Sequence, residues 1–423
     1  MPDPDGAPAP EIIGYPSVGG LSWPLFPSST MSSFTNLSTS ERKITPRNSG
    51  TIWSPFSPGT ENKGTGYERT AIYYKSSMAN LGEDSKVWLK TQAMKKLSRR
   101  DFLKYTGAAG GALFVGGNGG AGMSNTVSRV ALVKTDNRKN GVRTSLKVLN
   151  INPVKGKNVL IKPNFNTADV PPGSTHNDTL AALVKEVWDM GAKSISLGER
   201  SYPLTREVME KKGILPILDK LNVKVIDFDD LEDKDWVLFK PKKSHWPNGF
   251  RIARPILDTE CLVSTGCLKT HQYGGIFTLS LKLHVGVVPT SRHGYDYMKE
   301  LHGSPHQRKM IAEINEPFKP ALVILDGIDA FVDGGPMTGK CSRGEVFLAS
   351  TDRVAIDAVG VGILKYLGSN ESIMKPKIFD QEQIARAVEL GLGASSPSEI
   401  YVIAVDQTSQ GFRDQVIKVL EKG

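Results

Sequence analysis

Short apolar runs alternate with amphipathic helical patterns from residue 128 onward, and this alternation constrains the fold more than any other feature of the chain. The apolar runs are rich in Val, Ile and Leu and end in turn residues, as in NVLIKPN at 158–164. Such runs predict strands that are buried on both faces. The intervening segment 178–190 places Leu and Val on one stripe of a helix. The repeated pattern predicts an α/β fold, with a mainly parallel sheet and helices on both faces.

The predicted strands lie at 128–135, 158–164, 193–199, 223–229, 260–266, 321–327, 345–350 and 399–405. The predicted helices lie at 141–149, 178–190, 307–316, 353–367 and 380–390. We expect Asn177 or Asp178 to cap the second helix and Asp352 to cap the fourth. His176 could act as a capping neighbour or as a ligand, and for Asp357, one turn inside the fourth helix, a structural role is favoured over a place in a pocket.

Residues 1–93 differ from the rest of the chain, because they are rich in Pro, Ser, Gly and Thr and have no sustained helical or strand period. Such a segment buries too little surface to offset its ordering entropy. We expect this segment to be either a disordered extension or a wrongly assigned start, with the true chain beginning at Met94. The predicted α/β domain then covers 127–423, and 94–126 forms a separate unit.

Residues 94–126 begin MKKLSRRDFLK and continue YTGAAGGALFVGGNGGAGM. This segment resembles a twin-arginine export signal, with a positive region, a weakly apolar region and then small residues. The alternative is a basic helix start before a flexible linker. The resemblance implies the twin-arginine translocase as a partner and a periplasmic or other extracytoplasmic location. No segment is long and apolar enough for a confident membrane span, although an uncleaved signal anchor stays open.

Composition limits the classes of partner and cofactor. The net charge is +9, but Lys and Arg are spread over the chain without a long basic run, so nucleic-acid binding is not favoured. The three cysteines, Cys261, Cys267 and Cys341, contain no Cys-x-x-Cys pair and no iron–sulfur motif. They are expected as small buried hydrophobes. For Cys267, the neighbouring Lys269 could instead lower the thiol pKa.

The stretch Thr265–His293 concentrates cationic and protonatable side chains, including three of the seven histidines of the chain. In parallel sheets, ligands bind at the carboxyl ends of the strands. Several polar residues follow predicted strands and are expected at that edge, namely Lys162, Asn164, Glu199, Arg200, Lys269, His271, Asp326 and Asp352. The sequence therefore predicts a basic pocket there.

Ten ordered motifs support a family resemblance, among them VLIKPNFN, SISLGERS, STGCLKTH, TLSLKLHVGVVPTSRH and STDRVAIDAVG. From residue 128 to about 410 the chain resembles the bacterial and archaeal domain-of-unknown-function family 362. Members of that family are frequently fused to ferredoxin-type cysteine motifs, which this chain lacks. The family pattern commonly has Asn after the Lys of TLSLK, where this chain has Leu283 and then His284. The resemblance implies a fold and motif positions but no settled reaction.

The pocket is predicted to bind a small anionic molecule through a carboxylate or phosphate group. A desolvated lysine or a histidine there could move a proton. The predicted catalytic residues are His271, Lys269 and Lys282, and the predicted substrate-binding residues are Lys162, Asn164, Arg292, His293, Gly334 and Gly335. The alternative is that the cations form salt bridges to Glu199, Asp326 or Asp333, and that the glycine-rich turn 333–339 is structural rather than anion-binding.

A metal site stays open, with the candidate ligands His271, His284, His293, His302, Asp326 and Asp333. No H-x-x-x-H or H-E-x-x-H spacing is present, so these histidines could instead be hydrogen-bonded pocket residues. The metal and any other cofactor are unknown at this point. Three functions remain: an enzyme acting on a small anionic substrate, a non-catalytic periplasmic anion-binding or cofactor-carrying module, and a redox partner.

Overall fold

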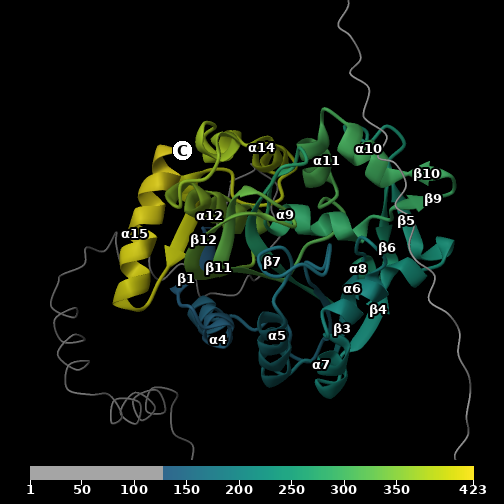
Figure 1. Ribbon diagram of the computed structural model, residues 1–423, viewed down its shortest axis with the longest axis horizontal. Helices are drawn as coiled ribbons and strands as arrows, with labels where there is room; N and C mark the ends of the chain where they lie inside the picture. The colour runs from purple at the N-terminus through teal and green to yellow at the C-terminus, as the bar shows by residue number, and fades with distance from the viewer. Residues whose placement is uncertain (1–126) are drawn as a thin grey trace, which may run out of the picture. The chain divides into compact units, whose positions relative to one another are not determined.

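The structure is a computed structural model and describes residues 127–423. The predictions for 1–93 and for 94–126 lie outside the described residues. The predicted α/β architecture is confirmed for the described part, in which helices cover both faces of a mostly parallel sheet (Figure 1).

A mixed sheet forms the centre, with strand order β13-β1-β12-β11-β7-β2-β3-β4 and β8 added beside β7. Its strands are β1 (Ser128–Lys134), β2 (Asn158–Lys162), β3 (Ser194–Glu199), β4 (Lys224–Asp227), β7 (Cys261–His271), β8 (Ile276–Thr278), β11 (Leu322–Gly334), β12 (Gly339–Ser350) and β13 (Ile400–Ile403). Strand β12 runs antiparallel to both β1 and β11, and β8 runs antiparallel to β7. The other neighbouring pairs are parallel, so the carboxyl ends of β2, β3 and β7 share one edge.

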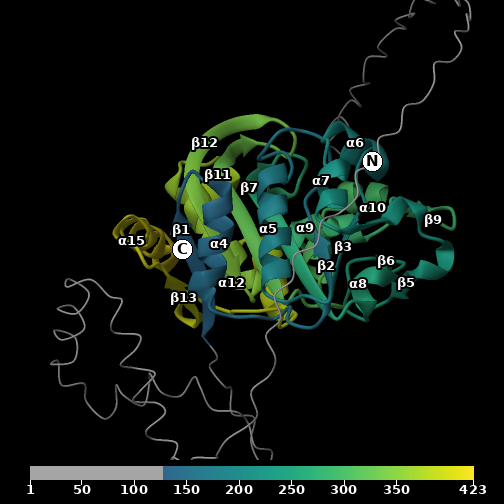
Figure 2. The same cartoon turned by 90° about the horizontal axis from the view of Figure 1, so that it is seen from below.

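Helices α4, α5 and α7 lie on one side of the sheet, and α9, α12 and α14 lie on the other (Figures 1 and 2). One apolar core contains residues of α4 (Arg138–Leu149), α5 (Asn177–Asp189), α6 (Thr205–Lys211) and α7 (Leu215–Lys220). A second core contains residues of α9 (Ser280–Leu283), α11 (Gln307–Glu313), α12 (Arg353–Tyr366), α14 (Glu382–Glu389) and α15 (Gln407–Lys422). The shorter helices are α8 (Arg254–Asp258), α10 (Tyr297–Gly303) and α13 (Glu371–Met374).

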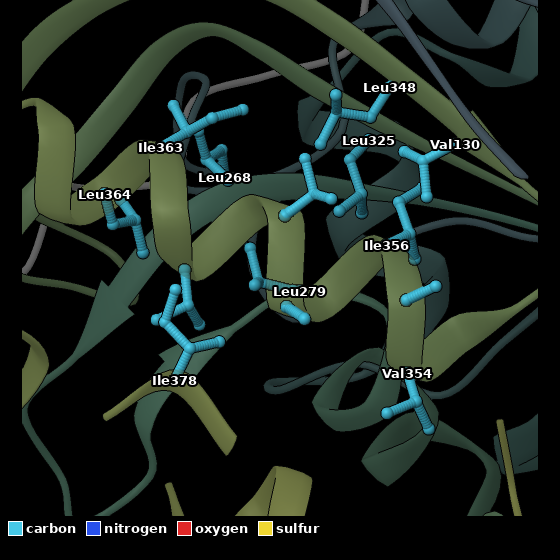
Figure 3. Packing of buried hydrophobic residues seen from close by; sticks show 14 of the residues in the cluster. Val130, Leu268, Leu279, Leu325, Leu348, Val354, Ile356, Ile363, Leu364 and Ile378 are labelled. Atoms are coloured by element: carbon cyan, nitrogen blue, oxygen red, sulfur yellow. The ribbon is translucent and has the colours of Figure 1, made fainter. Parts of the chain in front are cut away.

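Successive side chains of a strand point to opposite faces of the sheet, so alternate residues of a central strand belong to different cores. On β1, Val130 and Leu132 join the core beneath α12, whereas Ala131 and Val133 join the core beneath α4 and α5. Figure 3 shows Val130 among the side chains of the α12 core. Full burial of each large apolar side chain stabilises the fold by roughly 1.5–3 kcal/mol. The uniform apolar character of the strands follows from this two-sided burial.

A third core covers β2, β3 and the start of β7 on the α12 face. It contains Leu160, Phe228, Trp236 and Phe250, and two small hairpins belong to this region. The hairpins are β5 (Trp236–Phe239) with β6 (Phe250–Ala253), and β9 (Ser291–Arg292) with β10 (Tyr295–Asp296). The 3-10 turns are η1 (Phe228–Asp230), η2 (Asp233–Asp235), η3 (His284–Val287), η4 (Ile378–Asp380) and η5 (Pro397–Glu399).

Two capping predictions have different outcomes. Asp352 caps α12, because its carboxylate accepts from the N–H groups of Val354 and Ala355 at 2.8 and 2.9 Å. Helix α5 is capped by His176, whose Nδ1 accepts from the Asp178 N–H at 3.0 Å. The prediction of Asn177 or Asp178 as the cap is therefore wrong by one residue, and of the two roles considered for His176 the structure shows the capping one.

Candidate functional site

A pocket of about 810 Å³ opens at the carboxyl ends of β2, β3 and β7. Strand β2 contributes Lys162 and, just beyond its end, Asn164; β3 ends at Glu199, next to Arg200. The other residues that line the pocket are Asn166, Tyr202, Lys269, His271, Tyr273, Thr278, Lys282, Leu283, Val285, Gly286, Thr290, Asp296, Met298, Lys299, His302, Pro336 and Met337. The parallel strands therefore bring six of the eight predicted edge residues into one pocket.

Lys162 and Glu199 form a fully buried ion pair in the wall of the pocket. The Lys162 ammonium also donates to the Pro163 carbonyl at 2.8 Å, and the Glu199 carboxylate accepts from the N–H groups of Phe165 and Arg200 at 2.8 and 2.9 Å. Burial lowers the pKa of Lys162 and raises that of Glu199, and the attraction between the partners opposes both shifts. Lys162 is therefore a buried lysine whose charge is paired with Glu199.

Arg200 is a buried cation with its donors directed to neutral acceptors. Its Nε donates to the Val288 carbonyl at 2.6 Å, and its terminal nitrogens donate to the Val285 carbonyl and the Thr290 hydroxyl, each at 3.2 Å. None of the salt bridges found in residues 127–423 involves Arg200. The guanidinium thus holds the segment 285–290 by hydrogen bonds and brings a positive charge to the pocket without a direct salt bridge.

Lys269 and Lys282 add two more buried positive groups. The Lys269 ammonium donates to the carbonyls of Gly173 and Pro336 at 2.5 and 3.2 Å, and burial lowers its pKa to about 8. Lys282 has neither a hydrogen-bond acceptor nor a carboxylate partner among the described residues. Burial, reinforced by the charges of Lys269 and Arg200, lowers the pKa of Lys282 to about 7. Its amine is therefore partly neutral at neutral pH.

His271 lies next to Lys282, since the two side chains flank Gly275. A methyl group at Gly275 would lie 2.4 Å from Lys282 Cε and 3.0 Å from His271 Nδ1. Burial and the neighbouring lysine charges hold the pKa of His271 well below its usual value, so its imidazole is neutral. Its Nδ1 is buried without a hydrogen-bond partner, and so are Asn164 Oδ1 and Thr278 Oγ1. Buried polar atoms are rarely left unpaired, so these groups can accept hydrogen bonds from, or donate them to, water or a ligand.

Arg292 and His293 were predicted to join this pocket, and the structure places them outside its lining. The β9–β10 turn carries both side chains toward Asp233, at nitrogen–oxygen distances of 3.6 Å each. Arg292 also lies over the Trp236 ring, with its guanidinium carbon 5.6 Å from the ring centroid. His293 has a positive φ of 53° at the tip of this turn, which directs the chain away from the neighbouring basic residues.

Gly334 and Gly335 form the turn between β11 and β12, which contacts the pocket through Pro336 and Met337. Their N–H groups donate to the Asp333 carboxylate at 2.9 Å and to the Thr338 carbonyl at 2.7 Å, respectively. Those N–H groups are therefore used within the turn rather than offered to an anion. Gly335 is required for close approach, because a Cβ there would lie 2.1 Å from the Thr270 carbonyl oxygen.

The candidate metal ligands are dispersed. Among residues 127–423, no group of three or more His, Cys, Asp and Glu side chains is arranged to hold a metal ion. His284 is buried between the Ser264 hydroxyl at 2.9 Å and the Asn315 side-chain oxygen at 2.8 Å. Asp326 accepts from Arg138 at 3.0 Å, away from the pocket. His271 and His302 do line the pocket. His302 Nδ1 lies 2.7 Å from the Met298 carbonyl oxygen, so His284 and His302 are hydrogen-bonded, whereas His271 Nδ1 has no partner among the described residues.

Two further expectations need correction, the place of Asp352 and the burial of Cys341, which is exposed. Asp352 follows β12, and because β12 is antiparallel to its neighbours the residue lies at the opposite edge of the sheet, where it accepts from the Ser128 hydroxyl at 2.5 Å. Burial raises the pKa of the Cys267 thiol to about 11, so the effect of burial exceeds that of Lys269. Cys267 is therefore an inert buried thiol, and the buried-hydrophobe reading holds for it.

Several pocket residues were not predicted from the sequence. Gly286 packs against the ion pair, since a Cβ there would lie 2.5 Å from a Glu199 carboxylate oxygen. Tyr202 and Tyr273 line the pocket with largely exposed rings. Both tyrosines stand close in the chain to predicted residues, Arg200 and His271, which is the only sequence signal that could have indicated them.

The comparisons with known proteins agree with the two resemblances. Residues 159–362 match the family described as "Domain of unknown function (DUF362)", and residues 96–116 match the "TAT (twin-arginine translocation) pathway signal sequence". All pocket residues, from Lys162 to Met337, fall within the first match.

One curated relative is the thylakoid-associated protein sll1697 of Synechocystis sp., which is 27% identical over 255 residues, covering 58% of this chain and 75% of the relative. A solved structure, the lactate racemase apoprotein from Thermoanaerobacterium thermosaccharolyticum, aligns at 13% identity with a TM-score of 0.34 over 54% of each chain. Within residues 127–423 no helix has the length and apolar character needed to cross a membrane. The match at 96–116 implies export through the twin-arginine translocase, and residues 159–362 of the α/β domain match domain-of-unknown-function family 362.

Proposed function

We propose that this protein is a periplasmic enzyme that acts on a small anionic substrate, with His271 and Lys282 handling a proton. The observation that supports this most is the Lys282 side chain, which is 8% exposed, has no hydrogen bond or salt bridge among the described residues, and lies beside His271, whose Nδ1 is buried and unpartnered. The twin-arginine signal supports the proposed compartment.

The charges of the pocket favour an anion. Lys162 is neutralised by Glu199, whereas Arg200, Lys269 and Lys282 have no carboxylate within salt-bridge distance among residues 127–423. A carboxylate or phosphate bound beside Lys282 and Lys269 would gain charge-assisted hydrogen bonds in a site of low dielectric. Asn164 and Thr278 would hold a second polar group of the same ligand.

The proton chemistry follows from the two pKa shifts. A bound anion raises the pKa of Lys282 above about 7, so the complex holds Lys282 as an ammonium. His271 stays neutral and can accept a proton at Nδ1 in the tautomer that carries its hydrogen on Nε2. A C–H or O–H bond next to the anionic group would break, its proton would pass to His271, and the electron pair would stay on the substrate beside the ammonium. General base catalysis of this kind contributes about 10²- to 10⁴-fold.

The test begins with a screen of carboxylates and phosphates by native mass spectrometry on the full chain. Any ligand that binds is then incubated with the protein in D₂O, and exchange of its C–H groups is followed by NMR. The enzyme reading predicts that His271→Ala abolishes exchange but keeps the fold and much of the affinity. If His271→Ala lowers only affinity and the parent catalyses no exchange or turnover, the protein is a non-catalytic anion-binding module.

The pocket itself is tested with Lys269→Ala and Lys282→Ala. Lys234→Ala serves as the control, because it removes an exposed lysine that does not line the pocket. Binding of every anion by both pocket variants at parental affinity would disprove the pocket.

A further inference from the structure

The size of the pocket exceeds what a small anionic group needs. Cavities of about 300–1,000 Å³ typically hold drug-sized organic molecules. At about 810 Å³, this pocket leaves most of its volume unfilled when only a carboxylate or phosphate group lies at its basic end. The remaining volume therefore has to accommodate the body of the ligand.

The pocket is polarised between a buried basic end and an exposed aromatic rim. Lys269 and Lys282 are 0% and 8% exposed, whereas Tyr202 and Tyr273 are 70% and 52% exposed. All four residues line the same pocket. Large exposed aromatic side chains are costly to leave in water and are enriched where a ligand or partner covers them.

Two contacts join the basic end to the rim. The Tyr273 ring meets the His271 ring edge to face, with centroids 5.8 Å apart and planes at 80°. Beyond the end of β3, Tyr202 follows the buried Arg200 by two residues. Its N–H donates to the Asn166 carbonyl at 2.6 Å, which fixes the backbone of Tyr202 beside another lining residue. A ligand that extends outward from the basic end therefore meets aromatic rings.

Part of the pocket lining is apolar. Leu283 and Val285 line the pocket, as do Met298 and Met337. The Met298 sulfur also accepts from the Arg200 guanidinium at 3.4 Å, so an apolar side chain lies directly beside a cation of the basic end. Methionine sulfur packs favourably against aromatic rings.

We infer that the ligand is an aryl-bearing anion, whose carboxylate or phosphate group lies beside Lys269 and Lys282 and whose aromatic ring lies between Tyr202 and Tyr273. This inference rests on the proposed anion site and adds the chemical class of the ligand. The ring is held by offset or edge-on contacts with the tyrosines and by burial against the methionines.

Isothermal titration calorimetry on the full chain tests whether an aryl group strengthens the binding of an anion. Each pair of probes has the same anionic group with and without a phenyl ring. The pairs are 3-phenylpropanoate against propanoate, and phenyl phosphate against inorganic phosphate. The neutral 3-phenylpropan-1-ol is the control for charge. We expect the aryl member of at least one pair to bind about tenfold more tightly than its small partner, and the alcohol to bind more weakly than the acid. The pair that shows the gain identifies the anionic group.

Variants locate the effect. Tyr202→Ala with Tyr273→Ala is expected to remove most of the aryl preference, measured as the ratio of the affinities for the aryl member and the small member of the same pair. Tyr401→Ala is the control, because Tyr401 is 59% exposed on β13 and does not line the pocket. If propanoate and inorganic phosphate bind but gain nothing from a ring, or if the double variant keeps the full aryl preference, this inference is wrong and the anion site stands. If no anion in the panel binds, the proposed function fails as well.

Discussion

The Lys282 side chain is buried and has no hydrogen bond or salt bridge among the described residues. A positive charge on its amine therefore lowers the stability of the folded protein. The pKa of Lys282 is about 7 in the folded protein, compared with 10.5 for an exposed lysine. The folded state therefore binds fewer protons than the unfolded state between these two values, and stability is lost as the pH falls from about 10.5 to 7. Stability that is given up in this way is typical of functional sites.

Lys282→Met is accordingly expected to stabilise the protein at pH 6 by on the order of 2 kcal/mol, with little gain at pH 10 or above. The same variant should lose anion binding. Urea unfolding at pH 6 and 10 measures the first effect, and calorimetric titration measures the second. A variant that is less stable than the parent at pH 6 would show that the buried amine has an undetected partner.

The ion pair of Lys162 and Glu199 supports a second prediction at this scale. Glu199→Gln removes the charge that compensates the buried ammonium, and loss of one partner of a buried pair costs about 3–5 kcal/mol. Lys162→Met combined with Glu199→Leu should recover much of that loss, since no buried charge remains. Chemical denaturation of the parent, the single variant and the double variant checks this, and equal stability of single and double variants would contradict it.

Among the elements, the turn η3 determines how closely the backbone approaches that ion pair. A Cβ at Gly286 would lie 2.5 Å from a Glu199 oxygen and 2.9 Å from Lys162 Nζ. Gly286→Ala is therefore expected to destabilise the protein by about 1–3 kcal/mol and to weaken anion binding. Gly303→Ala, at the end of α10, is the matched control, because nothing lies within 4 Å of the added methyl group. Thermal unfolding of the two variants should separate them clearly.

The central strands and the helices α4, α5, α11, α12 and α14 were predictable because each carries its own periodic pattern, whereas α15 was not predicted. The strand predicted at 260–266 extends to His271 as β7, because its polar end is buried in the pocket and lacks the apolar signal of a buried strand. The helices α6 and α7 and the hairpin of β5 and β6 are short, and tertiary packing rather than local pattern defines them. Arg292 and His293 adjoin the basic cluster in sequence, yet a two-residue turn removes them from the pocket.

At the scale of the whole molecule, the strand order explains which parts of the site could be predicted. The parallel strands β2, β3 and β7 are neighbours, so polar residues at their carboxyl ends meet, as the sequence indicated for Lys162, Arg200 and His271. Strand β12 runs antiparallel to both of its neighbours, so its carboxyl end and Asp352 lie at the other edge. No local pattern signals the direction of β12. The aromatic rim depends on loops from separate elements, which only the folded chain brings together.

Export is the property of the whole chain that is most directly testable. Arg99 and Arg100 form the twin-arginine pair within the matched signal at 96–116. Arg99→Lys with Arg100→Lys preserves the charge but changes the guanidinium groups that define the motif, and Lys cannot reproduce their planar fork of donors. We expect the parent to appear in the periplasmic fraction of a bacterial host and the double variant to stay in the cytoplasm with the same fold by circular dichroism. Cytoplasmic retention with unchanged folding would separate export from stability, whereas equal export of both proteins would mean that the segment does not act as a twin-arginine signal.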